Sequence, residues 1–323
     1  MNIPLSLMFA GLAAAITAQP ILAAEVPYPS KPIRIIVGFP PAGAADIFAR
    51  LVGQKLSEAW GQAVVVDNRP GAGSTIGSEI AANATPDGHT LMAVSASYAT
   101  SAGLYKNLKY HPIKSFAPIT MMVSNSNLLL AHPSVPAKSV RELVAFAKAN
   151  PGKLTMGSAG TGSITHLAGE LFASMAGIKV THIPYKGGGP NLNAILGGEI
   201  QISIASVPAS LGHVRAGRVK ALGLTTLKRS AVLPEVPPIA EAGVPGYEAK
   251  NWYGILAPAA TPPAIIAKLN RQINEILRAP DFVEAAVKQG AEVEGGTPEE
   301  FKKYLESEIA KWSKVIKAAG VQL

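Results

Sequence analysis

The sequence predicts an α/β protein of two similar lobes, and three observations support this. The chain has 323 residues, a length typical of about two domains. Short apolar runs alternate with helical patterns, which favours mainly parallel sheets with right-handed crossovers. Segments 33–52 and 154–172 repeat one order of strand, small-residue loop and helix. Each lobe should therefore be a mainly parallel sheet flanked by helices.

The first residues have the features of a secretory signal peptide. Residues 5–17 form an apolar run, and Ala23 and Ala24 supply the small residues of a cleavage site. No Lys or Arg precedes the run and Leu22 is bulkier than usual before such a site, so a buried N-terminal helix is the alternative. We assign residues 1–24 to the signal peptide, cleaved near Ala24. We expect an unanchored periplasmic protein, because no cysteine is present to carry a lipid.

Strand-like and helix-like segments alternate within the first predicted lobe. Residues 33–39 are strand-like, and apolar residues recur at helical spacing over 47–60. The pattern continues with a strand over 63–68, a helical segment over 78–84 and a strand over 90–97.

Two long extended segments, 116–134 and 247–262, are expected to cross between the lobes. Between them stand a helix, two strand–loop–helix units and two strands, over 140–153, 154–177, 179–198, 200–210 and 219–226. We assign residues 25–127 with 249–323 to the first lobe and residues 128–248 to the second.

Two long helices are predicted to end the chain. Thr261 precedes a proline in the first turn of one, a favourable start. Thr297 and Glu300 have the spacing of a capping box at the start of the other. An apolar stripe over 301–316 is interpreted as core packing.

The charge of the chain is basic, with 29 Lys and Arg against 21 Asp and Glu and a formal net charge of +8. The basic residues are scattered without aromatic interleaving, so we expect no nucleic-acid partner. The charge indicates either an ordinary basic surface or a field that attracts anions.

Motifs of several enzyme classes are missing from the sequence. It has no Gly-x-Ser-x-Gly elbow and no Gly-Lys-Ser/Thr P-loop ending, and the glycines of 157–162 are not in Gly-x-Gly-x-x-Gly order. None of its six histidines stands at a metal-binding spacing. We therefore expect no catalytic residues, no metal and no cofactor.

Two loops that join a strand to a helix, 39–46 and 158–166, are the candidate binding elements. Glycine there lets the backbone approach a ligand, and a helix start offers unpaired N–H groups that suit an anion. In open α/β sheets ligands bind beyond the carboxyl ends of the strands. The two helix starts would then form a clamp for an anion with a negative group at one or both ends.

Side chains in these loops admit more than one role. Asp46 can offset the helix dipole, hold the first loop, or act as a general base, for which no partner is evident. His166 either braces the second loop or contacts the ligand. Ser163 or Thr161 can cap the helix, which would leave the other hydroxyls, including those of Ser158 and Thr165, for carboxylate oxygens.

The chain resembles the extracytoplasmic solute receptors of tripartite tricarboxylate transporters, also called the Bordetella uptake gene family. The resemblance covers essentially all of the chain after the signal, in family order. It rests on YPSKPIRIIVGFPPAGAAD, VVDNRPGAGSTIG, PDGHTLM, GSAGTGSITHLAGELF, HIPYKGGGP and WYGILAPAATP.

The resemblance implies a two-lobed periplasmic binding protein fold, type II-like, with the ligand cleft between the lobes. Such receptors bind small carboxylates and deliver them to a permease of one large and one small membrane subunit; we expect a monomeric receptor. The two loops reach the ligand, partly through water, and three serines at strand ends form its walls. The implied ligand-binding residues are Phe39, Ala42, Gly43, Ala44, Ala45, Asp46, Ser95, Ser97, Ser158, Ala159, Gly160, Thr161, Ser163, His166 and Ser206.

One residue departs from the family pattern, because Ala42 stands where a glycine is usual and adds a methyl group near the ligand. Ser206 occupies a substrate-selecting position and carries no charge. An amino-acid ligand would need a carboxylate for its ammonium group. The resemblance therefore favours a dicarboxylate or tricarboxylate, aliphatic or aromatic.

Two other functions stay open from the sequence. One is an enzyme of the same fold that uses Asp46 and His166, which would consume its ligand. The other is a sensory module that presents its ligand-bound state to a receptor kinase.

Overall fold

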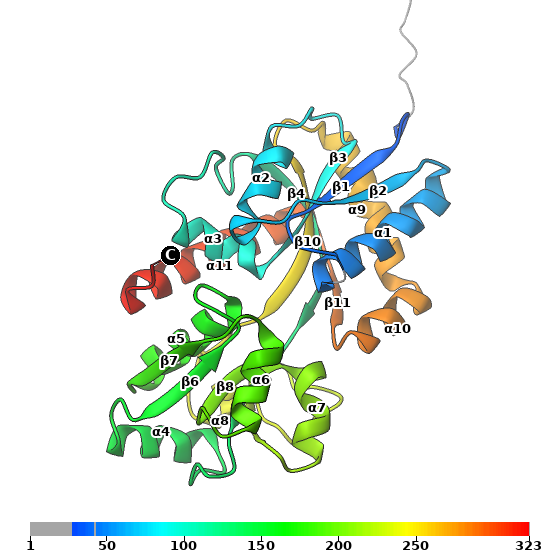
Figure 1. Cartoon of the computed structure of the whole chain (residues 1–323). Helices are drawn as coiled ribbons and strands as arrows, with labels where there is room; N and C mark the ends of the chain where they lie inside the picture. The colour runs from blue at the N-terminus through cyan, green and yellow to red at the C-terminus, as the bar shows by residue number, and fades with distance from the viewer. Residues whose placement is uncertain (1–27, 42, 323) are drawn as a thin grey trace, which may run out of the picture.

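The computed structural model describes residues 28–41 and 43–322 and arranges them in two lobes, one above the other in Figure 1. The signal peptide assigned to residues 1–24 lies outside the described residues. The first lobe is built on a six-stranded sheet with the order β11 (Glu292–Gly295), β4 (Phe116–Asn125), β10 (Asn251–Pro258), β3 (Thr90–Ser95), β1 (Ile33–Val37), β2 (Val64–Asn68). The second is built on a five-stranded sheet with the order β7 (Val180–Pro184), β6 (Leu154–Ser158), β8 (Ile202–Ser206), β5 (Asn127–Ala131), β9 (Lys220–Leu224).

The predicted two-lobed α/β fold is confirmed, and both sheets are mixed. β1 is parallel to β2 and β3, and β6 is parallel to β7 and β8. β10 and β5 instead run antiparallel to both neighbours. The expectation of mainly parallel sheets therefore holds for the strand–loop–helix units. It needs correction at β10 and β5, which enter from the other lobe, and at β11, which is antiparallel to β4.

The chain enters the second sheet between Asn125 and Asn127 and re-enters the first at Asn251. The assignment of the lobe boundaries to residues 127 and 248 stays a prediction.

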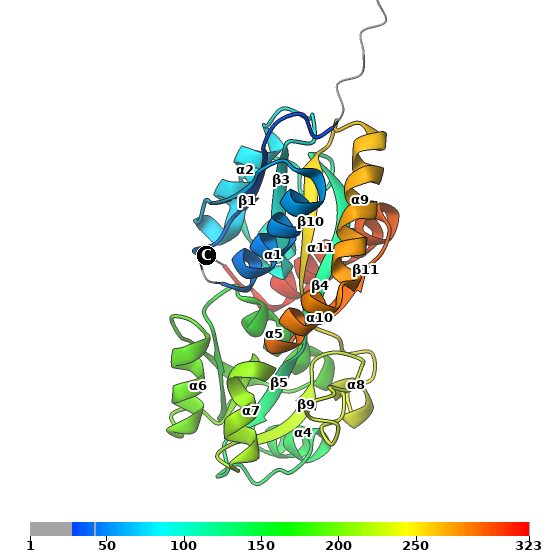
Figure 2. The same cartoon turned by 90° about the vertical axis from the view of Figure 1, so that its right-hand side faces the viewer.

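Helices cover both faces of each sheet (Figure 2). In the first lobe α1, α9 and α10 cover one face, and α2, α3 and α11 the other. Their bounds are α1 (Ala44–Trp60), η1 (Ala72–Ser74), α2 (Thr75–Ala82), α3 (Ala96–Leu104), α9 (Pro263–Arg278), α10 (Pro280–Lys288) and α11 (Pro298–Ala319). The second lobe contains α4 (Val140–Ala149), α5 (Ile164–Ala176), α6 (Gly188–Leu196), α7 (Val207–Arg215) and α8 (Ile239–Ala242).

The two predicted helix starts near the C-terminus have different outcomes. Thr297 and Glu300 form the capping box of α11, as expected. At α9 the residue before the first turn is Pro262, and no side chain caps it. The hydroxyl of Thr261 is buried without a hydrogen-bond partner among the described residues, so Thr261 does not cap this helix.

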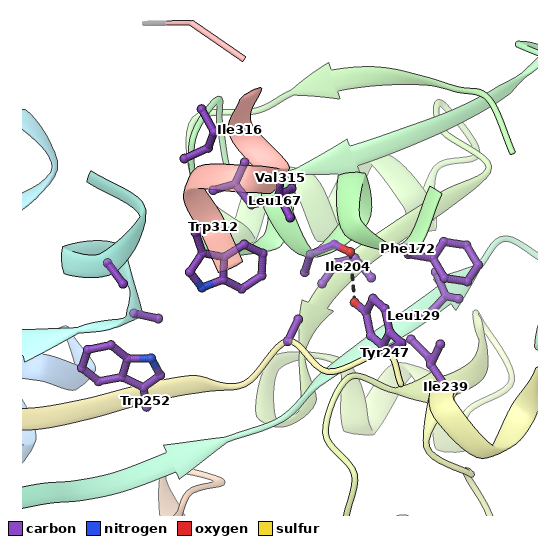
Figure 3. Close-up of a cluster of buried hydrophobic side chains, with 14 of the residues drawn as sticks. Leu129, Leu167, Phe172, Ile204, Ile239, Tyr247, Trp252, Trp312, Val315 and Ile316 are labelled. Carbon is purple, nitrogen blue, oxygen red and sulfur yellow. Dashed lines mark hydrogen bonds between the residues drawn. The ribbon is translucent and has the colours of Figure 1, made fainter. Parts of the chain in front are cut away.

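α11 joins the two lobes through one hydrophobic core. It packs on α3 of the first lobe and α5 of the second. Figure 3 shows Trp312 and Ile316 of α11 close to Leu167 of α5. In the same core the Tyr247 hydroxyl donates to the Ala168 carbonyl at 3.0 Å (Figure 3). The lobes therefore share buried apolar surface on this side of the molecule.

No helix within residues 28–41 and 43–322 is both long and apolar enough to cross a membrane.

Candidate ligand-binding site

The two predicted loops lie on the facing sides of the lobes. The first leaves β1 and enters α1, and both views place the start of α1 toward the second lobe (Figures 1 and 2). The second leaves β6 and enters α5, the helix that packs on α3 and α11. The strand–loop–helix repeat thus brings one helix start from each lobe to this side.

A polar network beneath the first loop fixes its shape. Asp46 is only 3% exposed, and its carboxylate accepts from Arg50 Nε at 3.0 Å and from Asn68 Nδ2 at 2.9 Å. Asn68 Nδ2 also donates to the carbonyl of Phe39 at 3.0 Å. Both ends of the loop are therefore tied to β2. This supports the loop-holding role of Asp46, whose oxygens are engaged within its own lobe.

The start of α1 leaves backbone donors available. Gly43 precedes the helix in an extended conformation, and no side chain caps it. The amides of Ala44 and Ala45 make no hydrogen bond among the described residues. A helix start with unpaired N–H groups favours a bound anion. Ala42, the departure from the family pattern, lies outside the described residues.

The second loop depends on glycine and on its own hydroxyls. Gly160 has φ +125°, a conformation that side chains disfavour. Ser163 caps α5 by accepting from the His166 amide at 3.2 Å, which settles the choice between Ser163 and Thr161. The Thr165 hydroxyl accepts from the Ala159 amide at 2.9 Å.

Ser158 holds the loop to the neighbouring strand. Its hydroxyl is completely buried, lies 2.7 Å from His182 Nε2 and accepts from the Gly160 amide at 3.2 Å. His182 stands on β7 and was not among the predicted residues. It is found through the sheet, because β7 runs parallel beside β6 and pairs His182 with Met156.

His166 braces the loop from below. It is 4% exposed, and its Nδ1 accepts from the Gly162 amide at 3.1 Å. Its ring stacks on that of His182, with centroids 3.7 Å apart and an interplanar angle of 16°. Burial and, to a smaller extent, the neighbouring His166 lower the pKa of His182 to about 4, although Glu170 acts in the opposite direction. The bracing alternative for His166 is the one that this geometry supports.

Other predicted side chains make no hydrogen bond through their hydroxyls within the described part of the chain. These are Ser95, Ser97, Thr161 and Ser206. Ser95 and Ser206 each precede a helix, α3 and α7, that no side chain caps. The amides of Thr161 and Ile164 are likewise without partners. The predicted residues therefore divide into bracing groups and groups still available to a ligand.

The described residues contain no group of three or more His, Cys, Asp or Glu placed to hold a metal ion.

The two-lobed fold is that of the periplasmic binding proteins, to which similar solved structures belong. In structure the chain is similar to Rpa4515 of R. palustris with adipate, at a TM-score of 0.77 and 36% identity over 92% of this chain and 99% of that one. It is also similar to MatC of Rhodopseudomonas palustris with bound malate, at a TM-score of 0.73 and 30% identity over 90% and 100% of the two chains.

Residues 48–321 match the tripartite tricarboxylate transporter family receptor. The chain is 37% identical to protein BugT of Bordetella pertussis over 316 residues, 97% of this chain and 95% of BugT. The chain belongs to the tripartite tricarboxylate transporter receptor family, which confirms the resemblance. Members of this family are solute receptors and not enzymes, so the enzyme alternative is set aside.

Proposed function

We propose that this receptor captures a small dicarboxylate or tricarboxylate between its lobes and delivers it to a permease of one large and one small membrane subunit. One carboxylate would lie at the start of α1 and another at the 158–163 loop. Neutral donors can hold an anion and still release it, because no buried counter-charge has to be left unpaired. We propose further that the chain is exported by cleavage near Ala24 and acts as a monomer.

The observation that carries this proposal is the set of unpaired donors on both lobes. Ala44 and Ala45 offer amides from the first lobe, and Thr161 and Ile164 offer amides from the second. The first amides of a helix have no partner within the helix, and such a helix start suits an anion. Open donors on a loop of each lobe therefore favour an anionic ligand between the lobes. The adipate and malate of the similar structures are dicarboxylates, which agrees with this ligand class.

The uncharged wall at Ser206 supports the exclusion of amino acids. Neither β8 nor α7 carries an acidic side chain of its own. A buried ammonium group without a paired carboxylate is costly.

A thermal-shift screen of the mature protein tests the proposed class. The panel holds dicarboxylates of four to six carbons, citrate, aromatic carboxylates and acidic amino acids. A ligand at about one hundred times its dissociation constant adds about 2.7 kcal/mol to the free energy of unfolding. We expect a shift for one dicarboxylate or tricarboxylate, recovered intact. A shift confined to amino acids would contradict the proposal.

A matched pair of variants locates the site. Thr161→Val removes an unpaired hydroxyl from the second loop, whereas Ser174→Ala removes an exposed hydroxyl further along α5. We expect Thr161→Val to weaken binding by about tenfold, the worth of one hydrogen bond to a charged group, and Ser174→Ala to have no effect. Equal affinities in both variants would remove Thr161 from the site.

A further inference from the structure

The stacked imidazoles of His166 and His182 support the second loop from two sides. His182 Nε2 lies 2.7 Å from the Ser158 hydroxyl, at the start of the loop. His166 Nδ1 accepts from the Gly162 amide at 3.1 Å, near its end. The ring centroids are 3.7 Å apart. The pair therefore connects β7, α5 and both ends of the loop through side chains alone.

The hydrogen bonds define the protonation state of His166. The Gly162 amide is a donor, so Nδ1 must present its lone pair and the ring proton must sit on Nε2. Nε2 lies 3.5 Å from Glu170 Oε1. The loop geometry thus requires a neutral His166. A proton on Nδ1 would oppose the Gly162 N–H and break the contact.

Few charges surround the pair. α3, β6, β8 and α6 carry no Asp, Glu, Lys, Arg or His, and β7 carries only His182. Glu170 is the acidic group of α5, and α11 places Val315, Ala318 and Ala319 in the groove beside it. Lys179 and Lys186, which stand on either side of β7, and Lys314, on α11, are exposed. Glu170 therefore favours protonation of His182, whereas His166 opposes it.

We propose that the neutral His166–His182 stack positions the 158–163 loop for ligand binding, and that protonation of the stack releases the loop and lowers the affinity for the ligand. The claim that the stack positions the loop concerns the loop alone. The claim that protonation lowers the affinity for the ligand rests on the proposed function. His166 and His182 are positioning residues in this scheme, because they act on the ligand through Gly162 and Ser158. The receptor would hold its cargo near neutral pH and lose it more readily in acid.

An NMR titration of the ligand-free receptor tests the loop half. The His166 and His182 rings and the Gly160 and Gly162 amides are followed from about pH 7.5 to about pH 4, across the range where histidines titrate. We expect the Gly162 amide to move with the same midpoint as one of the two rings. The Thr225 amide, which bonds the Asn127 carbonyl, should stay constant. A Gly162 amide that does not move while the rings titrate would overturn the inference.

Binding of adipate tests the second half. In the unmodified receptor we expect adipate to bind about twofold more weakly at about pH 4 than at about pH 7.5, because about half of the His182 rings are then protonated. In the double variant His166→Asn and His182→Gln the amide groups can keep the contacts to Gly162 and Ser158 without titrating. In this variant the ratio of the two affinities for adipate, one at each pH, should fall. Only the part caused by protonation of adipate itself should remain. His213→Gln, on α7 of the same lobe, should keep the full ratio.

The outcomes separate the two proposals. Equal pH ratios in the unmodified receptor and the double variant would overturn the link between the stack and affinity. If the double variant does not fold, His182→Gln alone should still reduce the ratio. If adipate binds at neither pH while the Gly162 amide follows the rings, adipate is excluded as the ligand and the loop inference stands.

Discussion

The carboxylate of Glu308, on α11, accepts a hydrogen bond from the indole Nε1 of Trp252, on β10, at 3.1 Å. Trp312 donates to the same oxygen at 3.0 Å, and Lys311 pairs with the other oxygen. Figure 3 shows both indoles in the core that the lobes share. Glu308 is 2% exposed, so a buried carboxylate holds α11 against the sheet of the first lobe. α11 also contacts α5 of the second lobe.

Glu308→Leu should be strongly destabilising. It leaves two buried indole N–H groups without an acceptor, and each unsatisfied donor costs about 1–3 kcal/mol. Glu308→Gln retains an acceptor and should cost less. Chemical denaturation measures both, with Glu306→Gln on the exposed face of α11 as the control. A Glu308→Leu variant as stable as the control would show that this network does not hold α11.

Gly160→Val should damage binding more than folding. The residue has φ +125°, and a Cβ there would lie 3.2 Å from the Tyr185 carbonyl. Gly152→Val is the control, because Gly152 also has positive φ but stands in open space before β6. Backbone strain should cost each variant about 1–3 kcal/mol. Only Gly160→Val should lose most of its affinity for the carboxylate that the screen identifies. Normal binding by Gly160→Val would refute the loop assignment.

Asn68→Ala should loosen the first loop from a distance. It removes the donor to Phe39 and Asp46 and should lower the free energy of unfolding by about 1–3 kcal/mol. Calorimetric titration should show weaker ligand binding as well, since the start of α1 is no longer held. Asn83→Ala removes an exposed amide that bonds only within its own helix end and should leave affinity unchanged. The same affinity in both variants would mean that the loop does not need Asn68.

The free energy of unfolding should fall as the pH drops from about 6.5 to about 4, because the folded state lowers the pKa of His182 to about 4. Between these values the unfolded chain binds the proton and the folded chain does not, so acid favours unfolding. Denaturation curves at several pH values should show this slope, and His182→Gln should reduce it. An unchanged slope in that variant would assign the acid sensitivity to other groups.

The sequence predicted the repeating units of the fold because apolar periodicity is local. Residues 33–60 and 154–176 carry their strand, loop and helix signals in order. α3 and α7 were missed because each begins directly after a strand, with small residues and no turn between. The antiparallel course of β10 and β5 depends on which lobe each strand comes from, which local patterns do not contain.

The residues of the candidate site likewise divide into those that the sequence could predict and those that it could not. Glycine and hydroxyl residues within a loop could be predicted, because their conformational role depends on neighbours in the chain. Asn68 and His182 could not, since each comes from an adjacent parallel strand. β2 places Asn68 in register with Val37, and β7 places His182 in register with Met156. The register of the parallel strands thus places Asn68 and His182 beside the loops that they support, which the loop sequences alone do not indicate. Which of these residues touch the ligand stays a prediction.

Gly290→Ala should disturb the contact between the lobes beside Ser206. Gly290, in the turn between α10 and β11, has φ +62°, and a Cβ there would lie 2.1 Å from Cγ of Pro208 in the first turn of α7. A methyl group cannot occupy that space unless Pro208 or the turn shifts, and we expect the lobes to move apart. X-ray scattering should therefore report a larger radius of gyration, and ligand binding should weaken because closure becomes harder.

The double variant Gly290→Ala with Pro208→Ala separates the clash from backbone strain. Removing the proline ring makes room for the methyl group, whereas the cost of a positive φ at residue 290 is unchanged. We expect the second substitution to restore the radius of gyration and most of the affinity, with a coupling free energy of at least about 0.5 kcal/mol between the two sites. Additive effects would mean that Gly290 is needed only for the turn, and that the Gly290–Pro208 contact does not set how closely the lobes approach.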